Sequence, residues 1–318
     1  MRDEIGGYIE LDDFKGKEYY PDLLALNSAR NAVVYLIKAR NIKKLCIPYF
    51  LCDCVSRVCV ENNCEVIYYH VGLNFRPDSE FAPPADSWLY LVNYYGQLSD
   101  DEILEFKRKY PCMILDNVQA FFQEPIGGID TIYTCRKYFG VPDGAYLSTN
   151  ARIDDVLDMD RSADRMMHLL GRYEGVAGDF YGAYQSAEEE HYKLPLRLMS
   201  KLTHNILRAI DYEVVRHKRN ENWRILSTAL SSINKLALKT PEAPFMYPLY
   251  VENGAAIRKR LIQKHIYIPT LWQDVMKVDS NDLERDMAQN ILPLPIDQRY
   301  GAEDMFKLIN AVDEEGNR

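Results

Sequence analysis

An aspartate and a lysine lie close together in the chain, each directly after a short apolar run. Asp116 follows the run 112–115 (CMIL), and Lys137 follows the run 131–134 (TIYT), 21 residues later by 137 − 116. An aspartate at the end of a buried strand commonly caps the next helix or turn. A lysine after a strand commonly lies on the surface, so each residue alone also fits a purely structural role.

The two residues together fit the chemistry of pyridoxal phosphate (PLP). A PLP enzyme needs a carboxylate that keeps the pyridine nitrogen protonated, so that the ring can accept electrons from a substrate carbanion. It also needs a lysine that bonds the cofactor and acts as a base once the substrate has displaced it. Asp116 and Lys137 could fill these roles, and Thr134, between them in sequence, could donate its hydroxyl to the cofactor phosphate.

The same residues resemble a motif of the DegT/StrS-type sugar aminotransferases, PLP enzymes that aminate keto sugars attached to nucleotides. The run 116–119 (DNVQ) is similar to the family's Asp-x-x-Gln, and the run 130–137 (DTIYTCRK) to its Asp, strand, Ser or Thr, and lysine. The resemblance implies that Lys137 bonds the cofactor and that Gln119 lies close to its ring. Gln119 could instead be a polar residue on a helical turn. A lysine rather than a histidine at position 137 implies transamination rather than dehydration of the sugar.

A second element of this family holds the cofactor phosphate with backbone amides at a helix N-terminus, where the helix dipole is positive. Ser28, Ala29 and Arg30, within the run 28–32 (SARNA), resemble this Ser-Gly-Thr-x-Ala element. Ala29-Arg30 replaces the family's Gly-Thr, so the close backbone approach is less favourable. Arg30 either adds a charge-assisted contact to the phosphate or is a surface residue.

Three more segments follow in the family's order, namely 47–50 (IPYF), 93–97 (NYYGQ) and, loosely, 140–144 (GVPDG). The family has an aromatic residue that stacks on the pyridine ring shortly after the first of them. The aligned position in this chain is Cys52, with Phe50 nearby.

The C-terminal third carries candidates for substrate binding. The run 266–272 (IYIPTLW) resembles the small-domain strand that leads toward the active-site mouth. Tyr267 and Trp272 could line the acceptor pocket, or simply pack in the core. Arg299 could bind the carboxylate of the amino donor as a bidentate fork, or form an ordinary surface salt bridge.

The elements that must position these residues alternate between strands and helices in the first half of the chain. We expect strands at 44–48, 64–69, within 86–95, and at 112–115, 131–134 and 145–148, and helices at 27–39, 53–62 and 100–110. Such alternation favours a three-layer α/β domain with a mainly parallel sheet, which binds ligands beyond the carboxyl ends of its strands. The resemblance implies the fold type I of PLP transferases.

The second half is predicted to differ in architecture. Helical patterns cover 153–170 and 196–230, and the polar stretch 171–191 between them is expected to be irregular. Strands at 246–252, 265–269 and 290–294 and helices at 254–264 and 303–312 predict a small α+β domain. We place the boundary near Asp211, giving a PLP-binding domain at 1–210 and a small domain at 211–318.

Composition limits the possible partners. The chain has 318 residues, 47% of them hydrophobic, and a net charge of −9, which argues against nucleic acid or an anionic membrane as partner. A charged N-terminus without an apolar run predicts a cytoplasmic protein. The seven cysteines are expected to be reduced, and neither their spacing nor that of the six histidines predicts a metal site.

These observations predict a PLP-dependent aminotransferase that moves an amino group from an amino acid to a keto sugar, and the resemblance implies glutamate as this amino acid. The resemblance also implies a nucleotide-linked acceptor of polysaccharide biosynthesis and a homodimer whose partner subunit completes the site. Two alternatives stay open, namely another PLP reaction such as that of a lyase or decarboxylase, and a non-catalytic PLP-binding protein.

Overall fold

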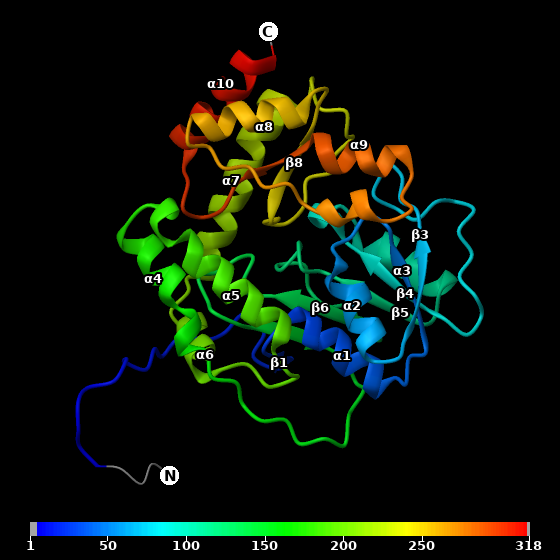
Figure 1. The fold of residues 1–318 in the computed structure, drawn as a ribbon, viewed down its shortest axis with the longest axis vertical. Coiled ribbons are helices and arrows are strands. Elements are labelled where there is room, and N and C mark those ends of the chain that lie inside the picture. Colours follow the sequence, from blue (N-terminus) through cyan, green and yellow to red (C-terminus); the bar gives the residue numbers. More distant parts are fainter. Residues whose placement is uncertain (1–4, 317–318) are drawn as a thin grey trace.

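The structure is a computed structural model that describes residues 5–316. Within this range seven strands form one sheet in the order β1-β7-β6-β5-β4-β2-β3, and two strands form a separate antiparallel pair (Figure 1). The large sheet contains β1 (Leu24–Leu26), β2 (Lys44–Pro48), β3 (Glu65–Tyr69), β4 (Trp88–Val92), β5 (Met113–Asp116), β6 (Asp130–Thr134) and β7 (Ala145–Ser148), and the pair contains β8 (Met246–Tyr250) and β9 (Ile291–Pro295). The helices are α1 (Ala29–Ala39), α2 (Asp53–Glu61), α3 (Asp100–Lys109), α4 (Met167–Glu174), α5 (Tyr181–Lys193), α6 (Lys201–Leu207), α7 (Tyr212–Leu230), α8 (Gly254–Gln263), α9 (Asp282–Asn290) and α10 (Ala302–Gly316). The predicted mainly parallel α/β architecture is confirmed.

Parallel pairing brings the carboxyl ends of five strands to one edge of the sheet. β3, β2, β4, β5 and β6 run parallel to one another, whereas β7 runs antiparallel to β6 and to β1. In the register of the sheet, Asp116 lies opposite Val92 on one side and Ile132 on the other. The loops after these strands therefore start side by side, which is where open α/β sheets bind ligands.

Helix α1 brings its N-terminus to the sheet because of its own local sequence. The Ser28 hydroxyl accepts a hydrogen bond from the amide of Asn31 and caps the helix. Val33, Leu36 and Ile37 are buried at helical spacing, and the helix contacts β6 and β7. Full burial of each such side chain contributes roughly 1.5–3 kcal/mol, which fixes the helix on the sheet.

A second core lies around β8 and β9. Trp223 and Leu226 of α7 pack there with α8 and α10, whereas Val215, near the start of α7, packs with Tyr138 in a core of the large sheet. The predicted small α+β unit therefore forms, with Asp211 as the N-cap residue of the helix that contributes to both cores. The domain boundary at this residue stays a prediction.

The predicted helix at 153–170 is wrong over most of its length. Residues 151–162 are irregular, and only α4, from Met167, overlaps the prediction. The buried carboxylate of Asp160 explains the difference. It accepts hydrogen bonds from Asn27 and Arg165 and pairs with Arg197, and these partners from distant segments hold its surroundings in an extended form. Tertiary contacts here outweigh the local helical pattern.

The predicted irregular stretch at 171–191 is also wrong, because α5 covers Tyr181–Lys193. Its sequence YGAYQSAEEEHYK contains alanine, glutamine and glutamate, which are good helix formers. The polarity of this stretch does not indicate irregular structure, because most of the helix faces solvent. The long pattern at 196–230 is divided into α6 and α7 by a turn at 208–211.

One further prediction differs from the structure in the C-terminal half, and two of the cysteines are neighbours in space. Residues 265–269 form no strand, and His265 has a φ of 60° that is incompatible with one. The sulfur atoms of Cys52 and Cys54 lie close together, and the expectation that all seven cysteines are reduced stays a prediction. Their positions at the start of α2 bring the two sulfur atoms together despite only one intervening residue.

Between residues 5 and 316, no helix has the length and apolar content that crossing a membrane requires.

Candidate active site

Asp116 ends strand β5 in a fully buried position. Its Oδ2 accepts a hydrogen bond from the Tyr90 hydroxyl at 2.8 Å, and its Oδ1 accepts one from the Val118 amide at 2.9 Å. Burial raises the pKa of the carboxyl, and the charge of Lys137 and these two hydrogen bonds partly oppose that rise. The carboxylate is thus held rigidly, with lone pairs left on both oxygens to accept a further donor.

Lys137 lies three residues beyond the end of β6. Its side chain is exposed, yet surrounding protein desolvates the ammonium enough to lower its pKa, which the charge of Asp116 partly restores. Its Nζ lies 5.7 Å from the centroid of the Phe245 ring. This combination describes a side chain in an open recess rather than on a convex surface. A lowered pKa increases the neutral fraction of the amine, which is the nucleophilic form.

The charges of Asp116 and Lys137 interact without a direct ion pair. Each affects the pKa of the other, but no ion pair among residues 5–316 joins their charged atoms within 4.0 Å. The two groups therefore approach the same region from the ends of adjacent strands and leave space between them. The structure brings together the pair that the sequence predicts to be catalytic.

Two backbone hydrogen bonds connect the Lys137 segment to the N-terminus of α1. The Cys135 amide donates to the Gly144 carbonyl, and the Gly144 amide donates to the Asn27 carbonyl. The buried Thr134 directly precedes Cys135, and Ser28, the cap of α1, directly follows Asn27. Both residues therefore flank the connection that these two hydrogen bonds form. The first amides of α1, including those of Ala29 and Arg30, have no partner within the helix and can bind an anion.

Gly144 is required at this junction. Its φ of +114° is unfavourable for other residues, and a Cβ would lie 2.9 Å from Cγ2 of Thr203. We expect Gly144→Ala to lower the free energy of unfolding by roughly 1–3 kcal/mol, measured by chemical denaturation. Gly140→Ala is the matched control, because no atom lies within 4 Å of its Cβ position and its φ is not positive. Equal stability of the two variants would contradict this role of Gly144.

Gln119 connects the loops that surround the recess. Its buried Oε1 accepts a hydrogen bond from the Tyr95 amide at 2.7 Å, and its carbonyl accepts one from the Phe245 amide at 3.2 Å. Tyr95 has a φ of 53°, so the first bond stabilises a left-handed residue after β4. The second positions the ring that lies near Lys137. These contacts give Gln119 a positioning role at the predicted place.

The candidates for ring stacking and acceptor binding have structural partners. Cys52 is the N-cap residue of α2, and its sulfur lies beside that of Cys54. Trp272 packs against Phe50, with ring centroids 4.6 Å apart, and against the tyrosines that follow β4. Tyr267 is exposed, and its hydroxyl contacts His265.

Arg299 forms a bidentate ion pair with Asp297, with N–O distances of 2.7 and 2.9 Å. The ordinary salt bridge that the sequence leaves open is therefore present. Gln298, beside it, donates to the carbonyl of Tyr138 at 2.7 Å. This segment of the small core thus adjoins the residue that follows Lys137.

Sequence reasoning missed several residues that shape the site. The main ones are the buried Arg219, which donates to the carbonyls of Pro244 and Phe245, and Tyr90, the hydrogen-bond donor to Asp116. Tyr90 occupies an apolar strand and reads as a core residue, while Arg219 lies in a helix rich in charged residues. Neither has a local signal, because its partners are distant in sequence.

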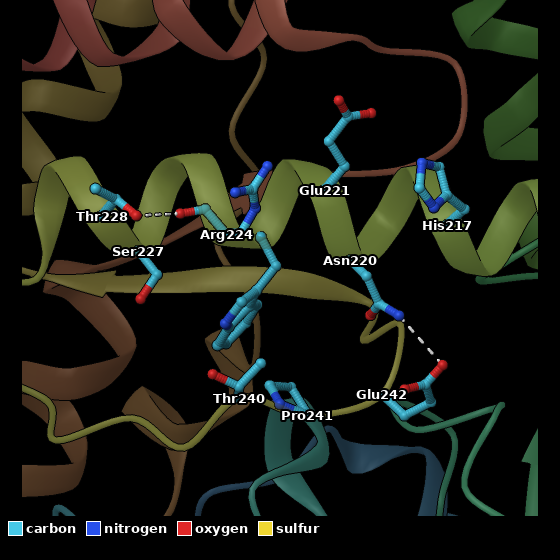
Figure 2. Close-up of a pocket in the computed structure, with 10 residues that line it drawn as sticks. His217, Asn220, Glu221, Arg224, Ser227, Thr228, Thr240, Pro241 and Glu242 are labelled. Atoms are coloured by element: carbon cyan, nitrogen blue, oxygen red, sulfur yellow. Dashed lines mark hydrogen bonds between the residues drawn. The ribbon is translucent and has the colours of Figure 1, made fainter.

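A groove of about 1000 Å³ lies apart from these residues, along α7 (Figure 2). It is lined by His217, Asn220, Glu221, Trp223, Arg224, Ser227, Thr228, Thr240, Pro241 and Glu242. Asn220 donates to Glu242 across it at 3.2 Å. None of the predicted site residues lines the groove, so the candidate chemistry is at the sheet edge.

Comparison with known proteins gives matches in structure only. No protein-family model matches the chain, and no curated protein matches it. NtdA from Bacillus subtilis, solved with bound PMP cofactor, matches with a TM-score of 0.66 and 14% identity over 92% of this chain and 72% of that chain. The sugar aminotransferase CalS13 from Micromonospora echinospora matches with 0.65 and 14% over 92% and 87%, respectively.

A DegT DnrJ EryC1 StrS aminotransferase from Brucella abortus also matches, with a TM-score of 0.63 and 14% identity over 93% of this chain and 86% of that chain. Each match spans both cores, since it covers more than nine-tenths of the chain. With 14% sequence identity, these structural matches establish the architecture alone. The predicted fold is confirmed, and the chain has the fold of the DegT/DnrJ/EryC1/StrS-type sugar aminotransferases.

Proposed function

We propose that this chain is a PLP-dependent aminotransferase acting on a keto sugar. The observation that carries the proposal is the pairing of Asp116 and Lys137, which approach one region from adjacent strand ends and influence each other's pKa. The fold alone would be compatible with many activities. A buried carboxylate facing a partly desolvated lysine is the particular arrangement that PLP chemistry requires.

The residues present fit this cofactor. Asp116 has free lone pairs for a protonated pyridine nitrogen and would keep it charged. Lys137 would bond the cofactor and later move the substrate proton. Thr134, Ser28 and the amides of Ala29 and Arg30 would hold the phosphate, where the dipole of α1 favours an anion. When bound, PLP supplies an electron-accepting ring.

Other predicted site residues belong to the same proposal. Gln119 would lie close to the pyridine ring, which its contacts with the loops around Lys137 support. Cys52 would lie at the ring face, at the start of α2. Arg299 would bind the donor carboxylate in exchange for Asp297, and Tyr267 and Trp272 would line the acceptor pocket.

The substrates are proposed from the relatives in structure. Two of them are described as a sugar aminotransferase and a DegT DnrJ EryC1 StrS aminotransferase. We therefore propose glutamate as donor and a nucleotide-linked keto sugar of polysaccharide biosynthesis as acceptor, in the cytoplasm. The proposed reaction involves no nucleic acid, no membrane and no metal ion.

A homodimer is part of the proposal as well. The segment that contains α4 and α5 exposes a dense group of apolar side chains, which marks an interaction surface. This group consists of Met167, Leu170, Tyr173, Val176, Tyr181 and Tyr184. A second copy that covers it would lie beside the N-terminus of α1 and could complete the phosphate site.

Incubation with glutamate tests the proposal. The protein loaded with PLP is expected to convert the cofactor to pyridoxamine phosphate and glutamate to 2-oxoglutarate, with one equivalent formed in the absence of acceptor. Absorbance spectroscopy and mass spectrometry of the released cofactor measure the conversion. Release of carbon dioxide, or of a fragment of the amino acid, would favour a decarboxylase or lyase. Binding of PLP without any conversion across a panel of amino acids would favour a non-catalytic protein.

A further inference from the structure

Three arginines gather between the N-terminus of α1 and helix α5. The guanidinium of Arg30 lies 4.2 Å from the centroid of the Tyr192 ring, and that of Arg57 lies 5.0 Å from the same ring. Arg136, directly before Lys137 in sequence, forms an ion pair with Glu188 of α5. One face of α5 therefore covers the cationic groups nearest to the proposed phosphate site.

This cluster contains more positive than negative charge. Arg57 is paired with Asp53, and Arg136 is paired with Glu188, whereas the contact of Arg30 is with an uncharged ring. Burial lowers the pKa of Arg30, and the charge of Arg136 lowers it further, so the two guanidinium groups are close enough to repel. Glu188 partly offsets this repulsion, and a further anion placed among the guanidinium groups would be stabilised by them.

Besides Asp53 and Glu188, two nearby features add no negative charge. The first turn of α1 contains no acidic side chain, so its positive end also has no carboxylate of its own. Burial and the charges of Arg136, Arg165 and Arg30 lower the pKa of His191 to about 2, which keeps this residue neutral. Its Nε2 lies 2.7 Å from the Pro142 carbonyl and anchors the end of α5 near the loop that contains Gly144.

We propose that Arg136, together with Arg30, binds the phosphate of the cofactor, and that Glu188 occupies Arg136 until the phosphate arrives. The inference rests on the proposed function and extends it to Arg136 and Glu188, to which no role is assigned above. A phosphate dianion carries more charge than the Glu188 carboxylate and also accepts from the α1 amides, so it displaces Glu188 from the guanidinium. Arg136 lies between the end of β6 and Lys137 in sequence. The residue that would bind the phosphate and the residue that would bond the aldehyde of the cofactor are therefore both placed by the end of this strand.

Affinities for PLP and for pyridoxal, which lacks the phosphate, separate this role from general structural effects. Arg136→Gln is expected to weaken binding of PLP about 10-fold or more and to leave binding of pyridoxal unchanged. Glu188→Gln is expected to strengthen binding of PLP about 3-fold or more, because the competing carboxylate is removed. Glu189→Gln, an exposed neighbour on α5, is the matched control and should match the unaltered protein. Inorganic phosphate should compete with PLP, and less so in Arg136→Gln.

Arg136→Lys serves as a control for folding, because it keeps the positive charge. It should bind PLP with an affinity between those of the unaltered protein and Arg136→Gln, and its thermal unfolding should be unchanged. Weaker or equal binding of PLP by Glu188→Gln would overturn the inference. Equal losses for PLP and pyridoxal in Arg136→Gln would also overturn it. Pyridoxal that still bonds Lys137 in that case would leave the proposed function intact, whereas failure of both compounds to bond the unaltered protein would contradict the proposed function itself.

Discussion

Replacing Lys137 with alanine is expected to abolish the visible absorbance band that the protein acquires with PLP. The amine of Lys137 is the one that faces Asp116, and desolvation lowers its pKa toward the range where the neutral form reacts. Loss of this base is also expected to slow the glutamate half-reaction by about 10²- to 10⁴-fold.

Absorbance spectroscopy and single-turnover kinetics measure both effects. The matched control is Lys201→Ala, which removes an exposed lysine of α6 and should leave band and rate unchanged. Borohydride reduction of the loaded protein, followed by peptide mass spectrometry, should locate the cofactor on residue 137. A band of unchanged intensity in Lys137→Ala would mean that another lysine bonds the cofactor.

Asp116→Asn is expected to have opposite effects on activity and stability. The amide preserves the shape of the side chain and can keep both local hydrogen bonds, because the Tyr90 hydroxyl can rotate to accept. It cannot keep a pyridine nitrogen protonated. We expect the rate of the half-reaction to fall about 10²- to 10³-fold while the cofactor still bonds Lys137.

The stability effect follows from the pKa of Asp116, which burial raises above its ordinary value of 3.8. Between the ordinary and the raised value, the folded protein keeps a proton that the unfolded chain has lost. The free energy of unfolding without cofactor therefore falls as the pH rises through this window. Asp116→Asn should not show this fall, so its stability relative to the unaltered protein increases with pH and then levels off.

Denaturant titrations across this pH range, together with stopped-flow kinetics, test both effects. Asp101→Asn, at an exposed position of α3, serves as control and should change neither the rate nor the pH dependence. An unaltered rate in Asp116→Asn would show that this carboxylate is not the partner of the pyridine nitrogen. Parallel stability curves for the two proteins would contradict the environment that raises its pKa.

Strands and helices with strong local patterns could be predicted from the sequence. The bounds of β2 and β7 match the prediction, and α1 ends at the predicted residue, Ala39, because the burial pattern there depends on neighbouring residues. The segment 151–162 could not be predicted, since two of the partners of Asp160, Asn27 and Arg197, lie more than 30 positions away on either side. β1 and α9 were missed, the former because it has only three residues.

The candidate site divides in the same way. Asp116 and Lys137 are recognisable because each belongs to a short motif at a strand end. The donor Tyr90 lies 26 residues from Asp116, and Glu188 lies 52 residues from Arg136. Pairs at such separation form only when the sheet and α5 are in place. The sequence thus identifies residues for the chemistry, while the structure is needed for the groups that regulate their charge.

Arg219 has a mechanical consequence for this protein. Its buried guanidinium bonds the carbonyls of Tyr138, Pro244 and Phe245 and the side chain of Gln298, so one cation connects the lysine segment to the second core. Loss of these bonds while the guanidinium stays buried would cost roughly 3–5 kcal/mol. The bonds of Arg219 therefore oppose movement of the lysine segment relative to the second core.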